Sequence, residues 1–377
     1  MNLIKSFLKS KKIFYKPKNK DILFFDTLNI RYFLPYLDQN NLEVLETRKK
    51  IINIFVLFKM LIKRKKINGV NYFKEYISIV NPKIIVSFTD NSIFLYEIKN
   101  FFPNIKILTI QNGMRNNIFF ESLETRQTLK ADIIFTWGKN ISDIFKKYID
   151  TKTFVIGSFI NNQIKNIEKD KKNSISFIST GYERINKSIQ ISDKKFVADY
   201  RYYQPEKNIL PILLEICKEK KMKLEIIGRC KEDEDSESEK NFYEKILGKG
   251  NFDYYPQGDK VCYLVSDKSR LSINIYSAFG LETLVRGNRC CFFNVRGKYC
   301  EEDSISCFWP GNFPEKGEFW SNEDSKEEIK RIVNFSLESD EDKWKDVIKN
   351  VFPNLIDIDE NNLTFRRTIK KILDHEL

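Results

Sequence analysis

Histidine is nearly missing from this sequence of 377 residues, and that scarcity removes several classes of mechanism. Catalytic Ser-His-Asp or Cys-His groups need a histidine beside the nucleophile, and an HExxH zinc site needs a pair of them. The single histidine, His375, is third from the C-terminal end. We therefore expect any acid–base or nucleophilic chemistry to come from Asp, Glu, Lys, Tyr or Cys side chains.

Metal-ligand and nucleotide motifs are missing as well. The seven cysteines include no CxxC pair, and Cys290 and Cys291 are neighbours in a predicted strand, so they point to opposite faces. Neither GxGxxG nor GxxxxGK[ST] occurs, which removes the main support for a dehydrogenase or an ATPase. We expect reduced cysteines in the core, no disulfides and no metal site.

Long apolar runs are lacking too, since none reaches the roughly 20 residues that a membrane-spanning helix needs. No apolar signal-peptide core follows the first lysines, so a cytoplasmic location is the default expectation. The formal net charge of +12 does not imply nucleic-acid binding, because high Lys, Asn and Ile usage is typical of an AT-rich genome.

The basic residues are unevenly distributed. Lysines crowd the first 20 residues, and Lys63-Arg64-Lys65-Lys66 follows the apolar run Ile51 to Ile62. Basic amphipathic segments of this kind can rest on anionic lipid headgroups. They can equally form a solvated face beside a core helix. The sequence leaves both interpretations open.

The length suits two domains of about 150 to 200 residues each. Short apolar runs without strict alternation recur between longer helical patterns, as a parallel sheet covered on both faces requires. These runs lie at 22–25, 84–88, 107–110, 133–137 and 154–156, and then at 175–178, 223–227, 271–275 and 290–293. The predicted fold class is α/β, with two Rossmann-like parallel-sheet domains facing a cleft.

The hydrophobic pattern lapses over the Lys- and Asn-rich residues 161–173, which we interpret as a hinge. The N-terminal domain is then expected over 1–160 and the C-terminal domain over 174–335. C-terminal helices over 336–377 could pack back on the first domain. Within the second domain, we interpret the acidic run Glu232 to Lys240 as a solvated loop.

Polar residues follow two predicted strands of the first domain, where ligands bind in parallel α/β folds. Asp90, which precedes Asn91, is a candidate general base or carboxylate nucleophile, and the alternative is that it caps the next helix. Gln111 and Asn112 offer amides to sugar hydroxyls, and Arg115 can clamp a carboxylate or phosphate. An ordinary Asn-Gly turn would explain part of this second segment without a ligand.

The segment from Tyr276 to Gly287 is the most informative one, and it is typical of a tight turn and short helix between two strands. Ser277 is placed to cap the helix, Gly280 lets a ligand approach its first turn, and Glu282 can accept hydrogen bonds from a ribose. Gly287 ends the helix. The pattern predicts a seat for a nucleotide phosphate, but Ser-capped helices between strands also occur without any ligand.

Three further places in the second domain offer contacts to a nucleotide. Ser179-Thr180-Gly181 follows one strand with hydroxyl and N–H groups, and Gly228-Arg229 follows the next. Tyr263 either stacks on a base or is a buried helix aromatic.

Taken in order, these motifs resemble those of bacterial surface-carbohydrate biosynthesis proteins of the transferase type, with a GT-B-like glycosyltransferase architecture. The resemblance runs through most of the chain. The motifs that carry it are Thr89-Asp90-Asn91-Ser92, Ile110 to Arg115, Trp137-Gly138, Ile156 to Phe159, Ile227-Gly228-Arg229, Ser277 to Gly287, Phe308-Trp309-Pro310-Gly311 and Gly317-Glu318-Phe319-Trp320.

The resemblance implies transfer of a sugar from a nucleotide-activated donor to a surface polysaccharide or lipopolysaccharide glycan, with neither metal nor cofactor. The second domain would grip the donor, and the first would receive a glycan or lipid-linked glycan acceptor. More distantly, the chain is similar to retaining transferases that use CMP-activated ulosonic acids such as Kdo. In that comparison Asp90 is the nucleophile and Arg115 the partner of the sugar carboxylate, but Asn112 stands where many GT-B cleft loops carry His.

Two sets of site residues follow. The catalytic set is Asp90, Asn91, Gln111, Asn112 and Arg115. The donor-binding set is Ser179, Thr180, Gly181, Gly228, Arg229, Tyr263, Tyr276, Ser277, Gly280, Leu281 and Glu282. The expected partners are the donor, the acceptor and an anionic membrane surface at the inner face, but no nucleic acid. Two alternatives stay open: a nucleotide-sugar 2-epimerase-like enzyme, and a non-catalytic glycan- or nucleotide-binding scaffold.

Overall fold

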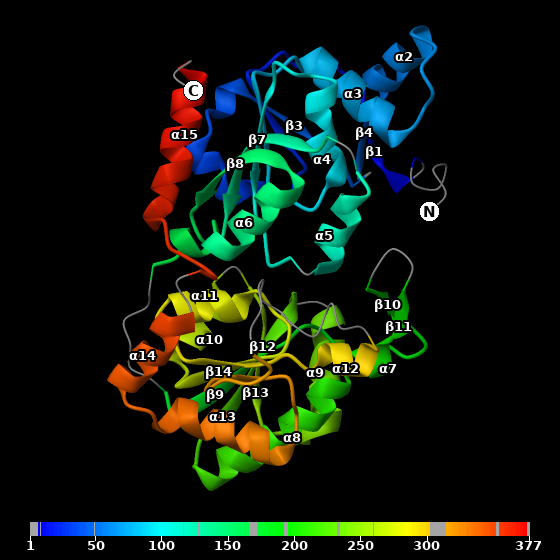
Figure 1. The fold of residues 1–377 in the computed structure, drawn as a ribbon. Coiled ribbons are helices and arrows are strands. Elements are labelled where there is room, and N and C mark those ends of the chain that lie inside the picture. The colour runs from blue at the N-terminus through cyan, green and yellow to red at the C-terminus, as the bar shows by residue number, and fades with distance from the viewer. Residues whose placement is uncertain are drawn as a thin grey trace. The chain divides into compact units, whose positions relative to one another are not determined.

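The computed structural model describes residues 7, 9–48, 50–115, 117–126, 128–165, 172–191, 195–231, 234–258, 260–301, 314–351 and 354–374. The chain forms two compact units. The N-terminal unit comprises residues 1–112, 119–163 and 358–377, and the C-terminal unit comprises 113–118 and 164–357. Figure 1 colours the elements of both units by their position along the chain.

A parallel six-stranded sheet in the order β3-β2-β5-β6-β7-β8 forms the centre of the N-terminal unit. Its strands are β2 Ile22–Phe25, β3 Leu42–Leu45, β5 Ile84–Ser87, β6 Lys106–Ile110, β7 Lys130–Thr136 and β8 Asp150–Val155. The helices are α2 Ile54–Ile62, α3 Gly69–Val80, α4 Ile93–Glu97, α5 Asn117–Glu124, α6 Lys139–Tyr148 and α15 Leu363–Leu373. Two short strands, β1 Lys11–Ile13 and β4 Ile51–Asn53, pair in parallel beside this sheet.

Both faces of this sheet are apolar, because successive side chains of a strand point to opposite faces. In β2, Leu23 and Phe25 belong to one hydrophobic core, and Ile22 and Phe24 belong to the other. Helices α3 to α6 contribute to the first core and α15 to the second. The continuous apolar runs seen in the sequence thus reflect burial on both sides.

The C-terminal unit holds a second parallel sheet of six strands, in the order β13-β12-β9-β14-β15-β16. Its strands are β9 Ser174–Ile178, β12 Lys223–Lys231, β13 Asp253–Gln257, β14 Leu271–Asn274, β15 Cys290–Phe293 and β16 Trp320–Ser321. The helices are α7 Asp199–Tyr202, α8 Gln204–Glu219, α9 Glu234–Leu247, α10 Val261–Lys268, α11 Phe279–Val285, α12 Arg296–Cys300, α13 Lys326–Glu338 and α14 Glu341–Val351. A small antiparallel pair, β10 Ser188–Gln190 and β11 Phe196–Ala198, lies between β9 and α7 in the sequence.

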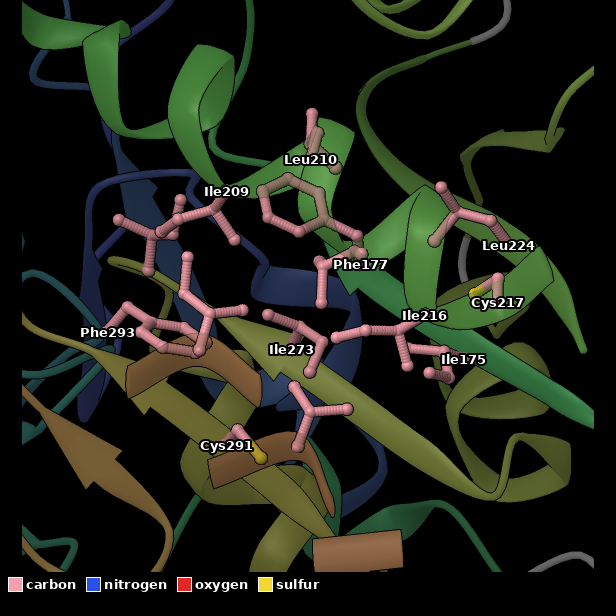
Figure 2. Packing of buried hydrophobic residues seen from close by; sticks show 14 of the residues in the cluster. Ile175, Phe177, Ile209, Leu210, Ile216, Cys217, Leu224, Ile273, Cys291 and Phe293 are labelled. Atoms are coloured by element: carbon pink, nitrogen blue, oxygen red, sulfur yellow. The ribbon is translucent and has the colours of Figure 1, made fainter. Parts of the chain in front are cut away.

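Aliphatic side chains from the helices cover one face of this second sheet. Figure 2 shows Ile209, Leu210 and Ile216 of α8 packed against Phe177 of β9 and Ile273 of β14. On the other face, Ser176 of β9 and Ser272 of β14 meet with their Oγ atoms 2.8 Å apart. The second series of strands and helices in the sequence therefore forms its own core.

The last two helices belong to different units. Helix α14 lies in the C-terminal unit, where Trp344 packs 5.5 Å from Phe319 between ring centroids. Helix α15 lies in the N-terminal unit, where Phe365 is fully buried against Phe33 and Phe159. The terminal segment 336–377 is thus divided between the two units. Trp344 packs α14 against the C-terminal unit, and Phe365 packs α15 against the N-terminal unit.

Some sequence motifs fall outside the described residues. They are Phe308-Trp309-Pro310-Gly311, His375 and part of the predicted hinge 161–173.

Phe365→Ala tests the contribution of α15 to the N-terminal unit. We expect a loss of about 3–5 kcal/mol in the free energy of unfolding, since a buried Phe leaves a cavity when truncated. Leu363→Ala is the matched control, because Leu363 lies on the same helix but is 42% exposed. Urea denaturation of both variants measures the difference, and equal midpoints would contradict the packing of α15.

Candidate functional site

Each sheet has a point at which consecutive connections leave in opposite directions, and ligands bind beyond the strand ends at such points. In the C-terminal unit the first strand, β9, lies between β12 and β14, so this point falls between β9 and β14. In the N-terminal unit the first strand of the sheet, β2, lies between β3 and β5, so the point falls between β2 and β5. The residues that follow these four strands define the candidate site of each unit.

Glu239 of α9 joins the ends of β9 and β12. Its side chain is fully buried, and its carboxylate accepts hydrogen bonds from the backbone N–H groups of Arg229 and Cys230 at 2.8–3.0 Å. It also accepts from Tyr254 Oη at 2.8 Å and from Ser179 Oγ. One carboxylate therefore connects the loop after β9 with the C-terminal part of β12, and sequence reasoning missed it.

The solvated loop predicted at 232–240 is wrong over its described part, because α9 begins at Glu234. Acidic residues are favoured at a helix start by the helix dipole. Ser236, Glu239, Phe242 and Tyr243 are buried on one face of this helix. That spacing of three and four residues was the available signal, but the density of charge concealed it.

The loop after β9, Ser179-Thr180-Gly181, is fixed by hydrogen bonds to the Ser179 hydroxyl. Tyr243 Oη donates to Ser179 Oγ at 2.7 Å, and the same oxygen accepts the N–H of Gly181 at 3.0 Å. Gly181 has a φ of +120°, and a Cβ there would lie 2.9 Å from Tyr203 Oη. Glycine is thus required by the backbone as well as by space.

A buried ion pair lies beside Thr180. Arg296 Nη2 donates to Glu206 Oε1 at 2.6 Å and to Thr180 Oγ1 at 3.1 Å, and both charged side chains are fully buried. Burial acts to lower the pKa of Arg296, but Glu206 and the Tyr202 and Tyr203 rings raise it above its usual value. The guanidinium therefore remains charged under the site.

Several buried polar atoms at this edge have no hydrogen-bond partner within the described part of the chain. They are Asn274 Nδ2 at the end of β14, Asn294 Oδ1 just after β15, Glu206 Oε2 and Arg296 Nε. Buried polar groups are nearly always paired, so unpaired ones are uncommon features of a protein interior. Three of these four atoms, those of Asn274, Asn294 and Arg296, lie at or just after the ends of β14 and β15, and Asp199 Oδ1, Asn334 Oδ1 and Trp344 Nε1 are further unpaired atoms elsewhere in the described residues.

Helix α11 differs from its prediction at its start. The N-cap is Ala278, and Ser277 instead accepts the Phe279 N–H at 3.3 Å while its own N–H binds Asn274 Oδ1 at 3.0 Å. The cap moves because the helix begins one residue later than the pattern suggested. A Cβ on Gly280 would lie 2.7 Å from Asn274 Cγ, so this glycine is required by packing against β14. Gly287, with a φ of 78°, ends the helix as predicted.

Glu282 is buried and accepts a hydrogen bond from Tyr263 Oη at 2.6 Å. Burial, and then the charge of Glu282, raise the pKa of Tyr263 well above its ordinary value, so the phenol keeps its proton. The Tyr263 ring packs edge-on against Phe279 in the interior. Leu281 is a core residue, and Tyr276 is half-buried. Base stacking by Tyr263 and ribose binding by Glu282 stay predictions.

Gly228 and Arg229 lie within β12, at the irregularity between its pairs Ile227–Tyr255 and Lys231–Gln257. A Cβ on Gly228 would lie 2.5 Å from Tyr254 Oη, so glycine makes room for the tyrosine that binds Glu239. The Arg229 side chain is exposed, whereas its backbone N–H is held by Glu239. This arginine is therefore a charged group on a fixed backbone.

In the N-terminal unit, Asp90 links the ends of β5 and β6. Its side chain is fully buried, and Oδ1 accepts the N–H of Asn112 at 3.0 Å. Asn112 Nδ2 donates in turn to the Phe88 carbonyl at 2.7 Å. The alternative in which Asp90 caps the next helix is wrong, because the N-cap of α4 is Ser92.

The other members of the predicted catalytic set have varied surroundings. Gln111 is fully buried, and its Oε1 accepts the N–H of Trp137 at 2.8 Å. Asn91 is exposed in the turn before α4.

Arg115 belongs to the C-terminal unit, where Nη1 donates to the Met114 carbonyl at 3.0 Å. In the same unit, a Cβ on Gly113 would lie 3.9 Å from Ala278 Cβ, so this segment lies beside the start of α11.

Asp26, just after β2, is a candidate that the sequence analysis missed. Its φ of 81° lies in the left-handed region, which non-glycine residues adopt rarely and often at functional sites. Oδ2 accepts hydrogen bonds from Arg48 Nε at 2.9 Å and from Thr89 Oγ1 at 3.4 Å. The signal was available, because Asp26 follows an apolar strand in the same way as Asp90.

Metal and thiol chemistry have little support in the described ranges. No group of three or more His, Cys, Asp or Glu side chains there is placed to hold a metal ion. The six described cysteines are free, and four of them are buried. Burial raises the pKa of the Cys217 thiol to about 12, so this side chain behaves as a small core residue.

Glu239→Ala tests the role of the buried carboxylate. Removing it leaves the N–H groups of Arg229 and Cys230 without their acceptor, at about 1–3 kcal/mol each. We expect a matching loss in the free energy of unfolding, measured by urea denaturation. Glu237→Ala, an exposed substitution on the same helix, is the control and should change stability by about 0.5 kcal/mol or less. Equal effects of the two variants would refute the role of Glu239.

The fold is similar to that of three solved structures. A Listeria monocytogenes protein assigned as a UDP-N-acetylglucosamine 2-epimerase has 13% identity and a TM-score of 0.53, and the similarity covers 95% of this chain and 96% of that one. The UDP-GlcNAc 2-epimerase of Methanocaldococcus jannaschii, in complex with UDP-GlcNAc and UDP, has 10% identity and a TM-score of 0.51, with 94% and 99% covered. Staphylococcus aureus MnaA with UDP has 12% identity and a TM-score of 0.51, with 94% and 97% covered.

At such low identity these similarities establish the fold alone. The predicted class of two Rossmann-like, GT-B-like units is confirmed by the two parallel sheets and by these structures. A search of curated proteins finds no match. Residues 108–373, well over half of the chain, match the family described as "putative O-antigen biosynthesis protein". The chain therefore belongs to this O-antigen biosynthesis family, as its resemblance to surface-carbohydrate biosynthesis proteins implied.

Proposed function

We propose that this protein is a glycosyltransferase that moves a sugar from a nucleotide-activated donor to a growing bacterial surface glycan. The observation that carries the proposal is the set of unpaired buried polar atoms at the ends of β14 and β15, next to the strand-order reversal of the C-terminal unit. Membership of the O-antigen biosynthesis family supports the glycan as product. The UDP or UDP-GlcNAc in two structures of the same fold supports a nucleotide ligand.

The donor nucleotide is assigned to the C-terminal unit. Asn274 Nδ2 at the end of β14 has no partner within the described residues, and the Ser179-Thr180-Gly181 loop lies beyond the adjacent β9. Arg229 is the exposed cation for a phosphate. Glu282 is the proposed partner of the ribose. The donor is a substrate in this proposal, and no metal or cofactor takes part.

The chemical step is assigned to the predicted catalytic set around Asp90. The acceptor hydroxyl oxygen attacks the anomeric carbon, and the bond from that carbon to the phosphate oxygen breaks. Asp90 takes the hydroxyl proton, and the nucleotide leaves with the electron pair of the broken bond. If the donor is a CMP-ulosonic acid, Asp90 instead attacks the anomeric carbon in a first step, and CMP leaves with the electron pair of the broken bond. In a second step the acceptor hydroxyl oxygen attacks the same carbon, its proton passes to water, and the Asp90 carboxylate is released. Arg115 binds the sugar carboxylate.

A 2-epimerase-like activity is the second candidate, because two of the structures of the same fold are assigned to that class. An epimerase needs no acceptor and returns the sugar still attached to its nucleotide or as a free epimer. A non-catalytic scaffold would bind the nucleotide and change nothing. We keep the cytoplasmic location and the glycan or lipid-linked glycan acceptor as parts of the proposed transferase function.

Asp90→Asn tests the proposed base. The amide oxygen can still accept the Asn112 N–H, but the amide cannot take a proton. We expect turnover, measured as nucleotide release from the donor, to fall by about 10²–10⁴-fold with nucleotide binding unchanged. Asp150→Asn, on a carboxylate that is 76% exposed in the same unit, is the control. Wild-type turnover in Asp90→Asn would exclude Asp90 as the catalytic base.

A thermal-shift screen tests the proposed donor site. Among CMP, UDP, GDP, CDP and dTDP we expect one nucleotide to stabilise the protein by about 2.7 kcal/mol at a concentration 100 times its Kd. Arg229→Gln should weaken that nucleotide about tenfold or more, through loss of a charge-assisted contact. Arg270→Gln, also exposed in the C-terminal unit, should leave the affinity unchanged. Equal affinity in both variants would exclude Arg229 as the phosphate partner.

A further inference from the structure

Helix α2 of the N-terminal unit is apolar on all sides although it lies at the surface. Between Ile54 and Ile62 only Lys59 is polar. Val56 and Met60 are fully buried, while Phe58, Leu61 and Ile62 on the outer side are 57–59% exposed. A helix of a water-exposed surface normally carries polar residues on its outer face. The outer face of α2 is therefore suited to an apolar environment.

Neighbouring elements extend this exposed apolar surface. Strand β1 pairs with β4, which leads directly into α2, and Asn53 Nδ2 at the helix start donates to the Tyr15 carbonyl at 3.0 Å. This contact brings Tyr15 (64% exposed) and Phe14 (73%) to the beginning of α2. Figure 1 shows α2 projecting beside α3 at the end of the N-terminal unit that carries β1 and β4. We call this surface, formed by β1, Phe14, Tyr15 and α2, the α2 face.

The exposed charged residues in the sequence segments that form the α2 face are all of one sign. No acidic residue occurs in the sequence between Glu46 and Glu75, or before Asp21. Glu75 itself is buried and binds Lys63 and Lys65 at 2.6 and 2.8 Å. The exposed cations that surround the apolar side chains are Lys9, Lys11, Lys16, Lys18, Lys50, Arg64 and Lys66. The face therefore combines exposed aromatic and aliphatic groups with a rim of positive charge.

We propose that the α2 face docks on an anionic lipid bilayer. Aromatic and aliphatic groups would enter the boundary between headgroups and acyl chains, and the lysine and arginine rim would bind anionic headgroups. A second copy of the chain fits less well, because two such faces would bring like charges together. The docking is peripheral, since within the described residues no helix is long and apolar enough to cross a membrane. The proposal does not depend on the transferase activity.

Vesicle cosedimentation of the full chain tests this proposal. We expect binding to an equal mixture of phosphatidylcholine and phosphatidylglycerol, and little binding to phosphatidylcholine alone. The triple variant Phe58→Gln, Leu61→Gln, Ile62→Gln should lose binding at least tenfold, and the double variant Arg64→Gln, Lys66→Gln should lose it about tenfold. Ile185→Gln with Phe196→Gln, at exposed apolar sites of the C-terminal unit, is the control and should bind as the wild type does.

Three results would overturn the proposal. They are equal binding to both kinds of vesicle, wild-type binding by the triple variant, and self-association in sedimentation velocity that the triple variant abolishes. The last result would assign the face to a second copy. Thermal unfolding of each variant, and its nucleotide-induced shift, should match the wild type. A variant that keeps the nucleotide shift but loses vesicle binding separates membrane docking from the donor site.

Discussion

Both candidate sites depend on one kind of interaction, in which a buried carboxylate accepts hydrogen bonds from backbone N–H groups. Glu239 binds the N–H groups of Arg229 and Cys230, and Asp90 binds that of Asn112. Glu46 does the same for Lys50 and Ile51 just after β3. These donors lie in loops, at the start of a strand or at an irregularity within one, and leaving them buried without an acceptor would cost free energy. Each carboxylate therefore holds a loop in one conformation.

In this arrangement, the side chains that fix the backbone differ from the groups that a ligand could contact. In the C-terminal unit, Glu239 and the Arg296–Glu206 pair bind the loop after β9, and Glu239 also binds the backbone of Arg229 and Cys230 in β12. The Arg229 side chain is exposed, and Asn274 Nδ2 has no partner within the described residues. Rigid loops reduce the entropy that a ligand must remove when it binds. The same unit therefore has both the fixed backbone and the unsatisfied groups that a nucleotide site requires. The proposed transferase function rests on that combination together with the family.

The sequence was most informative where burial dictated residue type. Strands such as Ile22–Phe25 and Cys290–Phe293 were found because a doubly covered parallel strand is apolar throughout. Edge strands such as Asp253–Gln257 and Trp320–Ser321 were missed because they are short or half-exposed and lack that pattern. Glu239 was hidden within an acidic run, and the φ of Asp26 leaves no trace in a sequence. The sequence analysis assigned Ser277, Gly280 and Glu282 to ligand binding. It could not predict that Gly280 packs against Asn274 or that Glu282 binds Tyr263, because these contacts depend on tertiary packing.

The fate of the donor sugar is the most direct test of the central claim. NMR spectroscopy of the purified protein with a nucleotide sugar that it binds, with and without a lipid-linked glycan acceptor, follows the nucleotide and the sugar separately. The account predicts release of the nucleotide with the sugar joined to the acceptor. Appearance of a 2-epimer without any acceptor, or a donor that stays unchanged when acceptor is present, would contradict it.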